Sequence, residues 1–359
     1  MKSVSLYRQT GLSLIELMVA MLISLILLGG VLQVFLSSKD MYRTNTAIAR
    51  VQEAGRFATD FIAFDVRQAG YKGECLSDPL IQLDLATATI DQKNAYSTTP
   101  AIQGWDNSKP VFFESSDKLR PNTDAFIVKY AGDGTEFESK GNNKVGGGNL
   151  GVEGETGTYS GQIVLVANST GCDIFQNTNN GNASTFQTNG NNETPGNTGT
   201  GMSQAYNGKF TAHVLRSHTY FIRDNAAEGR LPSLVRKVLS PSKADEELVD
   251  GIIDMQVTYG LDKDGDRLAD EYVEAGTNNL TASGEGDWNK VVSARIAVLA
   301  ISPETNVLDE PQKFVFPAIA GIERDDEYAV YGNDGTITIK ENRLAQVYTA
   351  TVAIRNRLP

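Results

Sequence analysis

The stretch "TGLSLIELMVAMLISLILLGG", residues 10–30, decides the fold of this chain, because it opens an apolar run that continues to Leu36. Between Leu12 and Leu36 the only interruptions are Ser13, Glu16, Ser24, Gly29, Gly30 and Gln33. As a helix this run would extend about 37 Å, which exceeds the roughly 30 Å of bilayer hydrocarbon. We therefore expect residues 12–36 to form a membrane-crossing helix.

The residues before the run indicate its orientation. "MKSVSLYRQTG" contains Lys2 and Arg8 and no acidic residue, so the positive-inside rule places this end in the cytoplasm and the remainder across the membrane. A secretory signal peptide would have a shorter apolar core followed by a small-residue cleavage site. Neither is present before "SSKDMYR", so we expect an anchor that is retained.

Glu16 is the anomaly within the run. An ionisable group inside a membrane helix costs roughly 2.5–3.5 kcal/mol even on lenient scales, so it usually has a partner. Cleavage after Gly11 would make Leu12 the amino terminus, and its cationic amine would lie on the same helix face as Glu16. The amine of a neighbouring helix offers the same pairing. Glu16 would then set the register between packed anchors.

Gly11, Leu12 and Glu16, within "GLSLIEL" and behind a short basic leader, resemble the class III signal of type IV pilins and type II secretion pseudopilins. The resemblance implies that a prepilin peptidase cuts after Gly11, that Leu12 is N-methylated and that Glu16 guides assembly. Leu12 stands where phenylalanine is usual in that family. The alternative is an ordinary signal anchor that contains an isolated acid.

Beyond the membrane segment the apolar pattern becomes periodic. Apolar residues recur at steps of three and four, which is the spacing of one helix face. They are Ile48, Val51, Ala54, Ala58, Phe61 and Ile62. Gly70 supplies a stop signal. We expect one helix from about Leu12 to Ala69, with residues 37–72 as its amphipathic continuation and Gly29-Gly30 as a weak point.

The amino-acid sequences of two segments indicate which branch of this family the chain resembles. "QEAGRFATDFIAFDVRQAGYKGEC" and the C-terminal "RLAQVYTATVAIRNRLP" are similar to PilW-type minor pilins. That resemblance implies a subunit that primes type IV pilus assembly and sits in the tip complex, with roles in twitching motility and adhesion. Its partners would be other minor pilins, the major pilin and a tip adhesin. It would reside in the inner membrane, with its C-terminal body in the periplasm, and later at the pilus tip on the cell surface.

Residues 73–359 favour a β-rich body. Segments rich in Val, Ile, Tyr, Phe and Thr alternate with turn residues, which predicts strands. The predicted strands are 110–114, 124–131, 162–168, 210–222, 233–239, 251–261, 291–301 and 346–355, with a hairpin around Asn333-Asp334-Gly335. The fold class is therefore α+β, a long helix packed on antiparallel sheet, as in pilins. Residues 141–208 are rich in Gly, Asn and Thr, and we expect mostly exposed loop there.

The chain has two cysteines, Cys75 and Cys172. Outside the cytoplasm the simplest interpretation is one disulfide, which would contribute about 2–4 kcal/mol. Two unpaired buried thiols are the alternative. With only two histidines and no Cys/His spacing, the sequence does not favour a zinc site.

"YGLDKDGDRLADEY" places Asp262, Asp264, Asp266 and Asp270 at positions 1, 3, 5 and 9 of a tight loop. Carboxylates that converge in this way repel one another unless a hard cation lies between them, and Ca²⁺ takes six to eight oxygen ligands from such loops. The match to an EF-hand is partial, because glycine stands at position 4 and Val273 at position 12. Calcium is the expected cofactor, and a solvated acidic hairpin is the alternative.

Composition excludes some functions. The net charge of −12 and the absence of a Lys/Arg cluster after residue 36 argue against nucleic-acid binding. His213 and His218 are five residues apart on a predicted strand and so face opposite sides, and no catalytic motif is present. We predict that the chain is not an enzyme.

The alternatives to the minor pilin function are a type II secretion pseudopilin and, more remotely, a membrane-anchored periplasmic enzyme.

Overall fold

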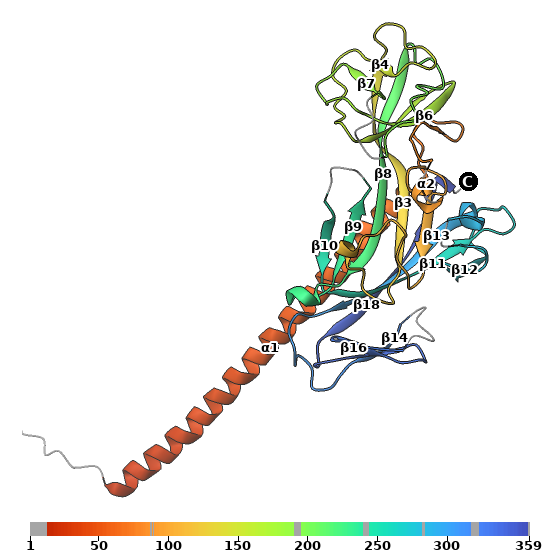
Figure 1. The fold of residues 1–359 in the computed structure, drawn as a ribbon. Coiled ribbons are helices and arrows are strands. Elements are labelled where there is room, and N and C mark those ends of the chain that lie inside the picture. Colours follow the sequence, from red (N-terminus) through yellow and green to blue (C-terminus); the bar gives the residue numbers. More distant parts are fainter. Residues whose placement is uncertain are drawn as a thin grey trace, which may run out of the picture.

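The computed structural model describes residues 13–86, 88, 90–189, 195–239, 244–281, 284–316 and 323–357. A single helix, α1 (Leu14–Gln68), projects from a β-rich body (Figure 1). Gly11 and Leu12, the predicted processing site, lie outside the described residues. The predicted fold class, one long N-terminal helix on a predominantly antiparallel body, is confirmed.

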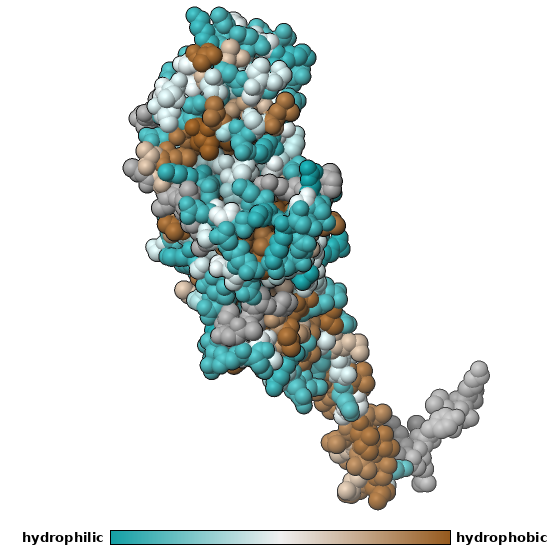
Figure 2. Space-filling model, turned by 90° about the vertical axis from the view of Figure 1, so that its right-hand side faces the viewer, coloured by the Kyte–Doolittle hydropathy of each residue, from teal (hydrophilic) through white to brown (hydrophobic). Residues whose placement is uncertain are grey.

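The first half of α1 has no protein around it. Within the described residues this is the one helix long and apolar enough to cross a membrane, with a mean hydropathy of 2.5 in its most apolar window and none of that window buried. Figure 2 shows the apolar surface concentrated on this protruding part, below a mostly hydrophilic body. The helix runs through Gly29 and Gly30 without a break.

The second half of α1 packs on the body. Its buried face comprises Ala47, Val51, Gly55, Ala58, Ile62, Ala63, Asp65 and Val66. Gly55 is required by packing, since a Cβ there would lie 2.1 Å from the Tyr348 ring. The helix ends at Gln68, and Gly70 adopts the left-handed φ of +76° that favours glycine after a helix.

The largest sheet has eight strands in the order β1-β6-β5-β8-β3-β2, with β9 and then β10 alongside the end of β8. All pairs are antiparallel except β1 with β6. The strands are β1 (Leu80–Ile81), β2 (Ile102–Trp105), β3 (Ala125–Glu138), β5 (Ile163–Asn168), β6 (Gly171–Gln176), β8 (Lys209–Arg223), β9 (Ser233–Val238) and β10 (Glu246–Asp250).

Three smaller sheets complete the body. One has the order β12-β11-β13-β18, with strands β11 (Ile252–Leu261), β12 (Glu271–Glu274), β13 (Val291–Ile301) and β18 (Ala345–Ala353). Another has the order β14-β17-β16-β15, with strands β14 (Lys313–Val315), β15 (Arg324–Asp325), β16 (Ala329–Tyr331) and β17 (Thr336–Ile339). A two-stranded sheet pairs β4 (Asn149–Gly151) with β7 (Thr185–Gln187). Among the described residues, the short helices are α2 (Ile90–Ala95) and the 3₁₀ turns at Ser115–Asp117, Ala226–Glu228, Asp287–Lys290 and Arg355–Arg357.

The main core lies where α1 meets two sheets. Val51, Ile62 and Val66 from the helix contact side chains of the large sheet, such as Phe126, and of the β11-β13 sheet, such as Val257. Because α1, the large sheet and the smaller sheet share one cluster of buried side chains, the body is built around the second half of the helix.

Two expectations from the sequence were wrong. Residues 110–114 form a loop, and β3 pairs instead with β2. Phe112 and Phe113 fill space beside Trp105 and Phe221 in place of joining a ladder. Residues 141–208 are also more than exposed loop, because they contain β4 to β7 and a buried cluster.

Candidate functional site

In the first turn of α1, Glu16 forms two hydrogen bonds with Ser13. Its carboxylate accepts a hydrogen bond from the backbone N–H of Ser13 at 2.9 Å, and its own N–H donates to the Ser13 hydroxyl at 3.2 Å. This is a capping box, for which Ser-x-x-Glu is the sequence signature. Glu16 therefore has a partner within its own chain before any amine is considered.

An exposed aromatic stripe continues the apolar surface of α1 toward the body. Phe57, Phe61 and Phe64 are 45%, 40% and 62% exposed, and their i, i+4, i+7 spacing places them on one side of the helix. The rings of Phe57 and Phe61 lie 6.5 Å apart. The helix thus presents apolar side chains along much of its length, on the membrane segment and beside the globular body.

Asp65 attaches the end of α1 to the large sheet. This buried carboxylate accepts hydrogen bonds from His218 Nδ1 at 2.6 Å, from the Tyr220 hydroxyl at 2.6 Å and from the Tyr130 hydroxyl at 2.7 Å. The Arg236 guanidinium lies 3.6 Å away. We call these five residues the Asp65 clamp. It draws on α1, β3, β8 and β9.

The clamp keeps Asp65 ionised. Burial by itself would raise the pKa of Asp65, but hydrogen bonds from His218, Tyr220 and Tyr130 outweigh it and hold the pKa below its ordinary value. Burial and the adjacent Asp65 charge raise the pKa of both tyrosines. The clamp is therefore a charged carboxylate held by neutral and cationic donors.

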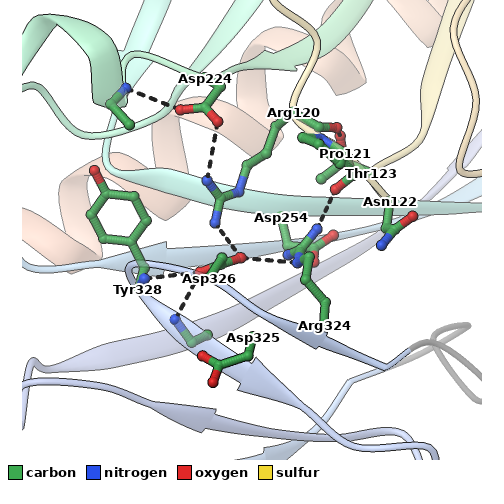
Figure 3. Close-up of polar contacts among 12 residues, drawn as sticks. Arg120, Pro121, Asn122, Thr123, Asp224, Asp254, Arg324, Asp325, Asp326 and Tyr328 are labelled. Carbon is green, nitrogen blue, oxygen red and sulfur yellow. Dashed lines mark hydrogen bonds and ion pairs between the residues drawn. The ribbon is translucent and has the colours of Figure 1, made fainter.

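A second buried network joins Arg120, in the loop before β3, to the sheet that contains β15 and the sheet that contains β11 (Figure 3). Arg120 lies 2.6 Å from Asp326, and Arg324 on β15 lies 2.9 Å from the same carboxylate. Arg324 is also 3.4 Å from Asp254 on β11, whose pKa burial raises despite this partner. These contacts connect the sheet of β15 to the sheet of β11 and to the loop that contains Arg120.

The disulfide predicted between Cys75 and Cys172 is present, with a Cα–Cα distance of 5.8 Å. It connects the segment after α1 to β6, across a separation of 97 residues. The upper part of the body is thereby attached to the chain that leaves the helix.

The aspartates of the acidic loop lie between β11 and β12. Asp262, Asp264 and Asp270 each place an oxygen within 4.8 Å of the others. Asp266, the fourth predicted ligand, does not join this group. All four carboxylates accept backbone N–H groups of the loop, Asp266 that of Leu268 at 2.7 Å. Arg267, where an EF-hand has glycine, adopts a φ of +68°.

This geometry fits a calcium ion. Two oxygens on opposite sides of Ca²⁺ are separated by roughly 5 Å, since each lies 2.3–2.6 Å from the ion. Asp262, Asp264 and Asp270 would be its protein ligands. Glu271 is engaged elsewhere, in an ion pair with Lys263 at 2.6 Å.

Family comparisons agree with the two ends of the chain. Residues 6–32 match the prokaryotic N-terminal methylation motif, and residues 219–356 match the family described as type IV pilus-assembly protein W. The chain is therefore similar, over these two segments, to type IV pilin-like proteins of the PilW type. The families it matches are pilin-type structural families and not enzyme families.

A comparison of the chain with curated proteins gives no match. Among solved structures, a type IV-like pilin from Thermus thermophilus is similar at 10% sequence identity and a TM-score of 0.30. The alignment covers 86% of this chain and 98% of that pilin.

The PilW match includes the acidic loop and β11, β13 and β18, but begins one residue after His218. The sequence alone identified Glu16, the cysteines and the acidic loop, but it did not reveal the Asp65 clamp. The available signal was a single acid in a helix face that otherwise carries Ala58, Ile62 and Val66. Its partners could not be named from the sequence, because His218 lies 153 residues away.

Proposed function

We propose that this chain is a minor pilin that primes type IV pilus assembly and sits in the tip complex. The observation that supports it best is the division of α1. One half is apolar and uncovered, and the other half is fixed to the body by the main core and the Asp65 clamp. Such a subunit is held in a membrane by its helix and enters a helical bundle without rearranging its globular part.

The steps before assembly follow from the N-terminal motif. A prepilin peptidase would cut after Gly11 and leave Leu12 as the methylated terminus. The body would reside on the periplasmic side of the inner membrane until extraction into the pilus. The partners would be the major pilin, other minor pilins and a tip adhesin, all reached through the helix or the surface beside it.

Calcium at Asp262, Asp264 and Asp270 belongs to the same proposal. The ion would stabilise the β11-β12 loop of an anionic body and would take no part in catalysis. We propose a structural role for the whole chain and no enzymatic one.

Deleting the gene tests the assignment. We expect loss of surface pili and of twitching, with exoprotein secretion intact. Normal piliation with lost secretion would instead identify a pseudopilin of a type II secretion system. Mass spectrometry of the membrane-extracted chain should find Leu12 as its first residue, and a mature chain that still begins at Met1 would contradict the proposal.

A further inference from the structure

A cavity of about 660 Å³ opens beside the second half of α1, above the level of the membrane segment. On the helix it is lined by Ala54 and Phe57, and on the body by residues that include Leu231, Val249 and Tyr328. Most of its lining is apolar. Phe57 belongs to the aromatic stripe, so the cavity continues the exposed apolar surface of the helix.

The arginines that line the cavity are already neutralised. Arg50 pairs with Glu304 at 2.6 Å and Arg343 pairs with Glu341 at 2.6 Å. Arg230 pairs with Glu247 at 2.9 Å. None of these acids lines the cavity. Each arginine at the cavity wall is therefore paired with a carboxylate that lies outside the cavity.

The acids that line the cavity are not neutralised in this way. Glu53, Asp250 and Glu327 are exposed at its wall. Within the described part of the chain, none of them lies within ion-pair distance of a lysine or arginine. Asp250 differs from the other two acids, because burial and a hydrogen bond with Glu247 raise its pKa while the Arg230 charge acts on it in the opposite direction. The surplus of negative charge at the wall therefore comes from Glu53 and Glu327. An apolar cavity with a surplus of negative charge favours a cationic occupant that also carries apolar surface.

We propose that this cavity receives a lysine or arginine side chain, together with its apolar neighbours, from another pilin subunit. The inference rests on the proposed function, because it requires a second subunit packed along α1. From Leu36, where the apolar run ends, to Arg50 at the cavity is about 21 Å of helix. A subunit that packs on the anchor therefore reaches the cavity by continuing along the same helix, past Tyr42 and Ile48, which are exposed.

The occupant can be identified by photo-crosslinking in the full chain, in cells that assemble pili. p-Benzoylphenylalanine replaces Phe57, which lines the cavity, and in a control strain it replaces Tyr159, which is 67% exposed in the upper part of the body. We expect an adduct from position 57 in which the captured peptide belongs to a pilin and contains Lys or Arg between apolar residues. A captured peptide without a basic residue overturns the proposal, and so does the absence of an adduct in a strain that makes pili.

Charge reversal at the cavity wall tests whether its acidic residues attract the basic side chain. Glu53→Lys with Glu327→Lys should lower the yield of the position-57 adduct about tenfold, since like charges across an interface cost several kcal/mol. The control is Glu153→Lys with Glu155→Lys, which makes the same change in net charge at exposed positions outside the cavity. An unchanged yield in the Glu53/Glu327 variant overturns the proposal while leaving the minor pilin function intact. If the proposed minor pilin function were wrong, a different experiment would show it, because piliation would then be normal after gene deletion.

Discussion

The Asp65 carboxylate on α1 accepts a hydrogen bond from His218 Nδ1 on β8 at 2.6 Å, across 153 residues of sequence. This contact is the centre of the Asp65 clamp and lies in the last turn of helix before Gly70. A helix that carries a membrane segment at one end transmits force to its body at the other, and the clamp is the polar part of that attachment. Its removal should therefore loosen the body from the helix.

Asp65→Asn should lower the free energy of unfolding by about 2–3 kcal/mol, because it leaves buried donors without a charged acceptor. Urea unfolding of the full chain in detergent, followed by the fluorescence of the buried Trp105 and Trp288, measures the change. Asp60→Asn is the matched control, since Asp60 is exposed on the same helix and pairs with Arg56 at 3.7 Å. Equal effects of the two substitutions would show that the clamp does not stabilise the body.

The Asp65 clamp also predicts how the stability of the folded chain changes at acidic pH. The pKa of Asp65 is lower in the folded chain than in the unfolded one, so its contribution is fully present above the unfolded pKa of about 3.8. It is lost as pH falls through the folded value. Stability below pH 4 should accordingly fall more steeply in the wild type than in Asp65→Asn. Parallel curves for the two proteins between pH 5 and pH 2 would contradict the lowered pKa.

Lys129 predicts a second rise of stability with pH, in a higher pH range. It is fully buried on β3, its ammonium donates to the Asn94 carbonyl at 2.9 Å, and burial lowers its pKa to about 7. Between pH 7 and about 10.5 the unfolded chain binds more protons than the folded one, so stability rises with pH, by at most about 1.4 kcal/mol per unit. Below pH 7 this contribution is constant.

Lys129→Met should remove that rise, and Lys140→Met, at an exposed position, should retain it. Chemical unfolding at pH 6, 7, 8 and 9 provides the comparison. A wild-type stability that is flat over this range would mean that Lys129 is solvated in the folded chain.

The sequence predicted the elements whose pattern is local. The periodicity of α1 predicted a helix from about Leu12 to Ala69, and the observed helix ends at Gln68. For most of the long strands the predicted ends lie within one or two residues of the observed ends. Runs of Val, Ile and Tyr favour a strand whichever partner strand they pair with. Residues 110–114 show the limit. Their apolar composition is that of a strand, but β3 pairs with Ile102–Trp105, and nothing within residues 110–114 encodes that choice.

The region 141–208 shows a second limit. Its composition is poor in apolar residues, yet Phe186 lies in a buried cluster with Phe137 and Phe210. Phe137 comes from β3, and Phe210 and Ala212 come from β8, but the other eight members of the cluster lie within residues 141–208. The few apolar residues of this region are thus gathered into one cluster by contacts distant in sequence, which its average composition does not reveal.

Calcium should stabilise the body through the acidic loop. If the ion binds only the folded chain, free calcium at 100 times its dissociation constant adds about 2.7 kcal/mol and raises Tm. Asp264→Asn should abolish the shift, because Asp264 is one of the three grouped carboxylates. Asp266→Asn should retain it, because that carboxylate lies outside the group. Millimolar calcium without a shift in Tm would eliminate the site.

The two partners available to Glu16 predict different phenotypes. As half of the capping box, Glu16 shares its role with Ser13, so Ser13→Ala should impair assembly as much as Glu16→Ala and cost about 1 kcal/mol of helix stability. As the counter-charge of an N-terminal amine, Glu16 acts without the Ser13 hydroxyl. Because a charge within the bilayer is costly without an ionic partner, we expect the second result. Ser13→Ala should assemble nearly normally, whereas Glu16→Ala should be processed and fail to assemble.

Scoring leader removal by mass spectrometry and incorporation into sheared pili by immunoblotting separates the two roles. Glu16→Gln sharpens the comparison, because an amide can still accept the Ser13 N–H but carries no charge. Failure of Glu16→Gln together with success of Ser13→Ala assigns Glu16 to the amine. Success of Glu16→Gln would show that the capping hydrogen bond is sufficient and that the charge does not set the register.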